Sequence, residues 1–167
     1  VAIDAMVSQG CRPFGSTHVV TDCKGQVIRT LGGRPALRVL EQEVMAVSEP
    51  HQERLRQGLF IGRAATEHRE RFGRDDFLSR RILRADEESG ALAVGDLMRV
   101  GQTVLFHHHD AETAHEDLSM LMDIQALRGR PAGGLLFTCS GRGPHLFDEP
   151  SHDARLICRA FDAEPPA

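Results

Sequence analysis

The apolar residues of this chain recur every three or four positions in three stretches, which predicts three amphipathic helices. The first lies between Pro35 and Pro50, two residues that favour a helix start and a helix end. The second follows Asp110, a residue type that caps helix N-termini, and the third spans 152–161 behind Ser151. Their expected buried stripes are Leu37, Leu40, Val44 and Val47, then Ala111, Ala114, Leu118, Leu121, Met122 and Gln125, and finally Leu156, Ile157, Ala160 and Phe161.

Short β-branched and apolar runs between glycine-rich turns predict strands. The expected strands are 18–21, 26–31, 58–62, 77–83, 91–94 and 103–107. Turn residues at 22–25 and 86–90 join two pairs of these strands into hairpins, with Gly90 suited to a left-handed position. Segments 11–15 and 66–76 are expected to be loops. Because hairpins require antiparallel pairing, we predict an α+β fold with a mixed, partly antiparallel β-sheet covered by helices.

One further strand is expected at 135–138, buried on both faces and followed by a chemically rich turn. Cys139 and Arg142 stand among glycines there, where free backbone N–H groups and a guanidinium could hold a carboxylate or phosphate. One alternative is a tight turn with a packed cysteine and a solvated arginine. Another is a structural Arg142 that pairs with Asp110 or Asp153.

Composition and charge exclude several classes of function. The chain has 167 residues, 41% of them hydrophobic, which favours one compact domain, with two abutting pieces as the alternative. A formal net charge of -4 without basic clusters argues against nucleic acid, and no apolar run is long enough for a membrane span. Four cysteines without CxxC spacing, and no signal-peptide pattern, predict reduced thiols and a cytoplasmic location.

Three adjacent histidines, His107 to His109, form a second candidate site. Successive side chains of a strand alternate between its two faces, so His107 and His109 are expected on one face and His108 on the other. Three such residues cannot converge on one zinc ion, and we predict no metal and no cofactor. A nucleophilic pair of Cys139 and His107 remains as an enzymatic alternative.

Seven motifs, in this order along the chain, together resemble one family. They are Cys-Arg-Pro-Phe-Gly (11–15), Val-Val-Thr (19–21), Val-Ile-x-x-Leu-Gly-Gly-Arg-Pro-Ala-Leu (27–37), Gly-Leu-Phe-Ile-Gly (58–62), Asp-Phe-Leu-x-Arg (76–80), Phe-His-x-x-Asp-Ala (106–111) and Leu-Leu-Phe-x-Cys-x-Gly-Arg-Gly (135–143). The chain resembles the FIST family of sensory domains. These occur in bacterial signal-transduction proteins and, fused to an F-box, in eukaryotic ubiquitin ligases.

The resemblance implies a non-enzymatic module that binds an amino acid or a related small metabolite. It divides the chain into 1–32, the end of the family's N-terminal part, and 33–167, most of its C-terminal domain. The family pattern continues beyond a position like Pro165 with a glycine-rich segment, so we expect this chain to lack a strand and part of any pocket. His109 replaces an arginine of the pattern, which removes a permanent cation there.

We therefore expect a cytoplasmic sensory domain that binds an amino acid or small carboxylate and signals through a partner protein or a fused output domain. The expected ligand-binding residues are Arg12, His107, Asp110, Cys139 and Arg142. No nucleic acid and no membrane are expected as partners. The alternatives are a thiol- or metal-dependent hydrolase that uses Cys139 and His107, and a protein-interaction module that recruits substrates.

Overall fold

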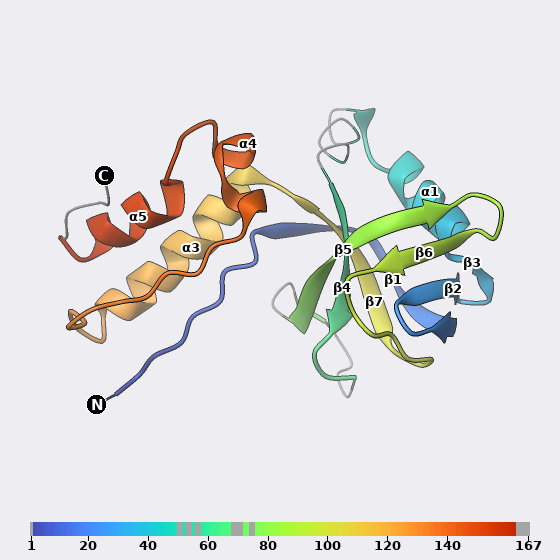
Figure 1. The fold of residues 1–167 in the computed structure, drawn as a ribbon, viewed down its shortest axis with the longest axis horizontal. Helices are drawn as coiled ribbons and strands as arrows, with labels where there is room; N and C mark the ends of the chain where they lie inside the picture. The colour runs from blue at the N-terminus through green and yellow to red at the C-terminus, as the bar shows by residue number, and fades with distance from the viewer. Residues whose placement is uncertain are drawn as a thin grey trace. The chain divides into compact units, whose positions relative to one another are not determined.

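A computed structural model of the chain shows two units, which are considered in turn (Figure 1). The sheet unit comprises Cys11–His109, and the helical unit comprises residues 1–10 together with 110–167. The structure describes residues 2–49, 52, 55, 58–67, 72–73 and 76–162.

The described part of the sheet unit contains seven strands and one helix that is described over its whole length. The strands are β1 (Cys11–Lys24), β2 (Val27–Leu31), β3 (Arg34–Pro35), β4 (Leu59–Ala64), β5 (Phe77–Asp86), β6 (Ala91–Val94) and β7 (Thr103–His109). Their order is β1-β7-β4-β5-β6-β2-β3, and β1 also pairs with β2, so six strands form a closed ring of pairings. All of these pairings are antiparallel. The α+β prediction is confirmed.

The core of the sheet unit lies where α1 (Ala36–Ala46) packs on the strands. Pro35 precedes the first helical residue, and Val39 and Leu40 are buried while Leu37 and Val44 pack against the core from its edge. The fully buried side chains of the strands around them are Val20, Ile28, Leu31, Ile61, Leu92, Val94, Val104 and Phe106. Each fully buried aliphatic or aromatic side chain of this kind contributes about 1.5–3 kcal/mol.

The two predicted hairpins are present. Gly25 (φ 59°) closes the turn between β1 and β2, and Gly90 (φ 69°) closes the turn between β5 and β6. Both backbones are left-handed, a conformation that glycine adopts without steric cost. The predicted inner strand at 103–107 is also present, since β7 lies between β1 and β4.

The expected loop at 11–15 is wrong, because these residues begin β1. Cys11 and Phe14 pair with His109 and Phe106 of β7, more than ninety residues away in sequence. Gly15 (φ 73°) lies within an irregularity of this pairing, between Phe14 and His18. Proline and glycine therefore mark a bend in a strand here, and the distant partner decides the secondary structure.

The helical unit contains α3 (Ala111–Ala126), a short 3₁₀ helix (Ser140–Arg142), α4 (Pro144–Phe147) and α5 (His152–Ala160). Asp110 caps α3 as predicted, accepting hydrogen bonds from the backbone N (3.0 Å) and the hydroxyl of Thr113. The buried face of α3 includes Ala114, Leu118 and Met122. The predicted apolar stripe of α5 is only partly buried. The buried residues of that helix are His152 and Asp153, in its first turn.

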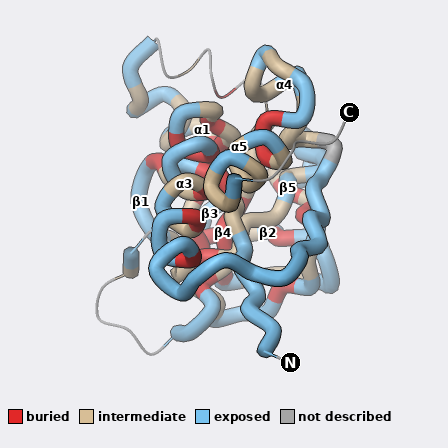
Figure 2. The backbone as a smooth tube through the Cα atoms, turned by 90° about the vertical axis from the view of Figure 1, so that its left-hand side faces the viewer, coloured by how far each residue is buried: buried red, intermediate tan, exposed pale blue. Residues whose placement is uncertain are grey.

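The predicted inner strand at 135–138 is wrong. This segment carries no strand or helix, and the exposed fractions of Leu135, Leu136 and Phe137 are 89%, 46% and 89%. Figure 2 shows exposed residues in pale blue, and residues 131–139 all belong to that class. A strand requires a neighbouring strand, and the described residues provide none for this segment.

Two further predictions concern residues that the structure does not describe. Pro50 and most of the predicted loop at 66–76 lie outside the described residues. Within the part that is described, no helix combines the length and the apolar character that a membrane span requires.

Candidate functional site

A groove of about 370 Å³ lies in the sheet unit, between the start of β1 and the C-terminal end of α1. It combines one basic side chain with apolar walls. The residues that line it are Arg12, Pro13, Phe14, Gly15, Ala46, Val47, Ser48, Leu55 and His108. Ligand cavities in proteins commonly measure about 300–1,000 Å³ and join a mostly apolar lining to a few polar groups.

The β1–β7 ladder determines which side chains reach this groove. Arg12 pairs with His108, and Phe14 pairs with Phe106, so these four residues share one face of the sheet. Arg12 is exposed, whereas His108 is buried beside the Phe14 ring, with 6.1 Å between ring centroids. The exposed side chain of Arg12 therefore lies on the same face of the sheet as the aromatic residues Phe14, Phe106 and His108.

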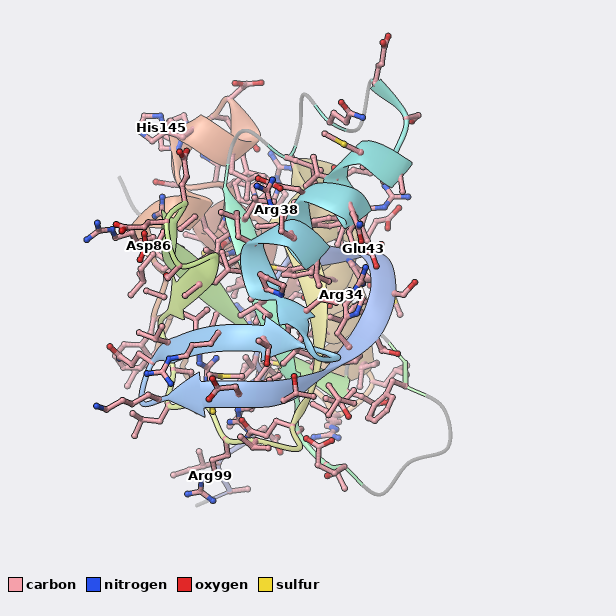
Figure 3. The ribbon with its side chains drawn as sticks, turned by 90° about the vertical axis from the view of Figure 1, so that its right-hand side faces the viewer. Arg34, Arg38, Glu43, Asp86, Arg99 and His145 are labelled. Atoms are coloured by element: carbon pink, nitrogen blue, oxygen red, sulfur yellow. The ribbon has the colours of Figure 1, made fainter. Side chains whose placement is uncertain are left out.

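β1 packs closely against α1 next to the groove. Nε2 of His18 lies 2.8 Å from a carboxylate oxygen of Glu43, which projects from α1 in Figure 3. A Cβ atom at Gly15 would overlap the Glu43 carboxylate. The irregularity of β1 at Gly15 therefore lets the strand approach the helix closely.

His107 lies on the opposite face of the same strand, as the predicted alternation requires. Its imidazole is 1% exposed, its Nδ1 lies 3.0 Å from the Leu105 carbonyl oxygen, and its ring is 5.8 Å from that of Phe77. A Cβ atom at Gly62 would overlap the His107 ring. The side chain is thus enclosed within the sheet unit and does not line the groove.

The residues that the structure describes contain no group of three or more His, Cys, Asp or Glu side chains arranged to hold a metal ion. His109 stacks on Phe60, with 4.3 Å between ring centroids. None of the four cysteines is part of a disulfide.

In the helical unit, Arg142 forms a buried ion pair with Asp153. Its Nε and Nη2 donate to the two carboxylate oxygens at 2.6 and 2.9 Å, and only 8% and 7% of the two side chains are exposed. Nη2 also lies 3.4 Å from the Ala114 carbonyl oxygen, and the guanidinium carbon lies 5.4 Å from the Phe147 ring centre. This bidentate geometry corresponds to the structural alternative for Arg142 that names Asp153.

Two histidines extend this ion pair. His152 stacks on Phe147 with 3.7 Å between centroids, its Nδ1 lies 3.1 Å from Asp153 Oδ1, and its Nε2 lies 2.9 Å from Nδ1 of His115. Burial opposes ionisation of Asp153, but the hydrogen bonds from Arg142 and His152 outweigh it, so the pKa of this carboxyl is held below its ordinary value. Asp153 therefore remains an anion that fixes both neighbours.

The five predicted ligand-binding residues are divided between the units. Arg12 and His107 belong to the sheet unit, and Asp110, Cys139 and Arg142 to the helical unit. Asp110 caps α3, Cys139 is exposed, and Arg142 binds Asp153. Their grouping into one site stays a prediction.

The sequence patterns do not indicate most of the groove lining, above all Ala46, Ser48 and Leu55. Val47 is expected in the apolar stripe of α1, and His108 is expected on the face opposite His107. The sequence signals that pointed to the groove were therefore the alternation of side chains along β7 and the apolar stripe at the end of α1. The missing information was that β1 begins at Cys11 and passes beside that helix end.

Two family matches together cover nearly the whole chain. The FIST N domain family matches residues 1–34, and the FIST C domain family matches residues 36–166. The chain belongs to the FIST family. FIST domains are regarded as sensory domains of signalling proteins.

Curated relatives of this FIST chain are longer proteins. The uncharacterized protein Rv0628c of Mycobacterium tuberculosis is 44% identical over 155 residues, which cover 92% of this chain and 40% of the relative. The uncharacterized protein Mb0898c of Mycobacterium bovis is 41% identical over 154 residues, covering 91% of this chain and 40% of the relative. The chain therefore spans 40% of the length of these relatives. No solved structure matches it.

Proposed function

We propose that this FIST chain is a ligand-binding sensory domain and that the groove beside Arg12 holds an amino acid or a related small carboxylate. The observation that carries the proposal is the groove itself, an opening of about 370 Å³ with a guanidinium at its rim. A guanidinium binds a carboxylate through two parallel hydrogen bonds. The ligand carboxylate would meet Arg12.

The remaining lining favours a ligand with a short apolar side chain. Phe14, Val47 and Leu55 provide an apolar wall, and the Ser48 hydroxyl offers a polar group at the same opening. A small carboxylate with an aliphatic substituent satisfies both surfaces, because its charged end and its apolar end meet separate parts of the groove. This assignment uses Arg12 of the five predicted residues and gives Arg142 a structural role.

A hydrolase that uses Cys139 and His107 has less support. The His107 imidazole is 1% exposed and its Nδ1 contacts a backbone carbonyl oxygen, whereas a general base must reach its substrate or nucleophile. We therefore propose binding without catalysis and without a cofactor. Four cysteines outside disulfides fit a reducing cytoplasm, where a partner protein or a fused output domain would receive the signal.

The test is a thermal-shift screen with amino acids and small aliphatic carboxylates, repeated on Arg12→Ala, Arg12→Lys and the control Arg29→Ala. Arg29 is an exposed arginine of β2 and does not line the groove. A ligand at a hundredfold excess over its Kd adds about 2.7 kcal/mol of stability. We expect Arg12→Ala to abolish the shift, Arg12→Lys to retain part of it, and Arg29→Ala to retain all of it. An undiminished shift in Arg12→Ala would refute the proposed site.

A further inference from the structure

Four ionisable side chains meet where α5 lies beside α3 in the helical unit (Figure 1). The side chains of Arg142, Asp153 and His152 are buried, with exposed fractions of 8%, 7% and 9%, whereas His115 is exposed. Replacement of a buried ion pair by apolar residues of similar size is often neutral or stabilising. Helix α5 nevertheless buries His152 and Asp153, and its apolar stripe is only partly buried. The stability of the fold alone therefore does not account for this cluster.

Hydrogen bonding determines where the protons lie along the cluster. The Asp153 carboxylate is an anion and can only accept, so Nδ1 of His152, at 3.1 Å, carries a proton and donates it. In a neutral imidazole the other nitrogen, Nε2 of His152, is then an acceptor. Nδ1 of His115 lies 2.9 Å from this acceptor and therefore donates. The lone pair of the neutral His115 ring is thus on Nε2, in an exposed side chain.

This order of donors and acceptors matches the geometry that activates a nucleophile. In such sites the nucleophile lies about 2.6–3.2 Å from a base, and a third group orients the base. Here His115 is the nucleophile, His152 is the base, and Asp153 orients the base. The Phe147 ring also holds the base in place, because it stacks on His152 with 3.7 Å between centroids. The cluster therefore contains each group that a nucleophilic attack by Nε2 of His115 requires.

The charges around His115 indicate which electrophile can approach it. Glu112 precedes it by three residues on α3, is exposed, and lies on the same side of the helix. A carboxylate in this position repels phosphate groups and other anions. The Arg142 guanidinium does not offset the repulsion, because it is buried and paired with Asp153. The donor that fits these charges is an uncharged acyl compound.

We propose that His115 is a modification site that accepts an acyl group from an uncharged ester or thioester. Its Nε2 lone pair attacks the carbonyl carbon, and the bond from this carbon to the oxygen or sulfur breaks with the electron pair on the leaving atom. The Nδ1 proton of His115 passes to Nε2 of His152, whose imidazolium form Asp153 stabilises, and then through water to the leaving group. The products are an acyl-imidazole and an alcohol or thiol. The proposal is independent of ligand binding in the groove.

Incubation of the protein with p-nitrophenyl acetate, an uncharged ester, tests this transfer. Peptide mass spectrometry would compare acetylation of His115 with that of His145, an exposed histidine of α4 labelled in Figure 3. We expect acetylation of His115 to be at least about tenfold faster, because a positioned base assists only this histidine. Equal rates at the two histidines would overturn the proposal.

The base is tested by His152→Phe, which removes the acceptor nitrogen and keeps an aromatic ring beside Phe147. Acetylation of His115 should then be no faster than that of His145, and an undiminished rate would contradict the role of His152. NMR of the imidazole nitrogens in the unaltered protein provides a measurement that needs no variant. The neutral rings of His115 and His152 should both carry their proton on Nδ1. A proton on Nε2 of neutral His115 would overturn the proposal.

Acetyl phosphate tests the class of donor, because it is an anion and can deliver either an acetyl or a phosphoryl group. The preference for His115 over His145 should be smaller with acetyl phosphate than with the ester, and Glu112→Gln should recover part of it. A phosphoryl group on His115 would overturn the acyl assignment.

Discussion

Replacement of Arg142 by alanine is the sharpest test of the helical unit. It leaves the Asp153 carboxylate, 7% exposed, without the two hydrogen bonds that Arg142 donates to it. Removal of one partner of a buried ion pair costs about 3–5 kcal/mol. The remaining contact from His152, at 3.1 Å, offsets part of the lost attraction. We therefore expect a loss of about 3 kcal/mol in the free energy of unfolding.

Urea titration followed by far-UV circular dichroism measures this loss, since the chain has neither Trp nor Tyr for fluorescence. Arg142→Lys should recover part of it, because lysine keeps the charge but lacks the planar fork. The control is Arg155→Ala. Arg155 is 44% exposed and lies 3.9 Å from a Glu149 oxygen, so its loss should stay below about 0.5 kcal/mol.

The size of the Arg142→Ala effect decides between two roles. A loss below about 1 kcal/mol with an unchanged denaturant slope would show that the pair is not buried in solution, and it would reopen a ligand role for Arg142. A loss of about 3 kcal/mol together with an intact ligand response would establish Arg142 as scaffold. The double variant Arg142→Met with Asp153→Leu should lose less than Arg142→Ala, because no unpaired charge remains.

Three further predictions concern acid, exchange and metal. Because the pKa of Asp153 is lowered, the ionised carboxylate stabilises the fold at pH values above the ordinary carboxyl pKa, and this stabilisation is lost as the pH falls through the lowered pKa. Urea titrations from neutral to strongly acidic pH should show the loss, and the free energy of unfolding should fall less steeply with pH in Asp153→Asn. Amides of 103–106 should exchange slowly, because β7 lies between two strands, and fast exchange would remove them from the core. EDTA should leave the Tm unchanged, and stoichiometric zinc in purified protein would contradict this.

Local signals predicted those elements whose partners lie close in sequence. The turns at Gly25 and Gly90 and the cap at Asp110 each depend on a few consecutive residues, and all three are present. The start of β1 was missed because its partner strand follows some ninety residues later. Segment 135–138 has the composition of a strand, but pairing makes a strand, and the described chain provides no neighbour for it.

The candidate site was likewise predictable only where the sequence signal is local. Strand alternation separated His107 from His108, and Asp153 was already a named partner for Arg142. The groove could not be predicted, because it depends on how closely β1 approaches the end of α1. That distance is determined by Gly15 and by the His18–Glu43 contact, which join residues 25 or more positions apart. No local sequence pattern indicates how closely β1 and α1 approach each other.

The contact between Gly62 and His107 has a consequence for how this sequence can vary. The imidazole occupies the volume that any larger side chain at position 62 would need, and its enclosure leaves it no other place to turn. The Cβ atom of Phe77 lies on the same side, 2.9 Å from where a Cβ at position 62 would stand, so loss of the imidazole alone would not make room for a methyl group. Glycine at 62 is therefore expected to persist even in lineages that replace the histidine at 107.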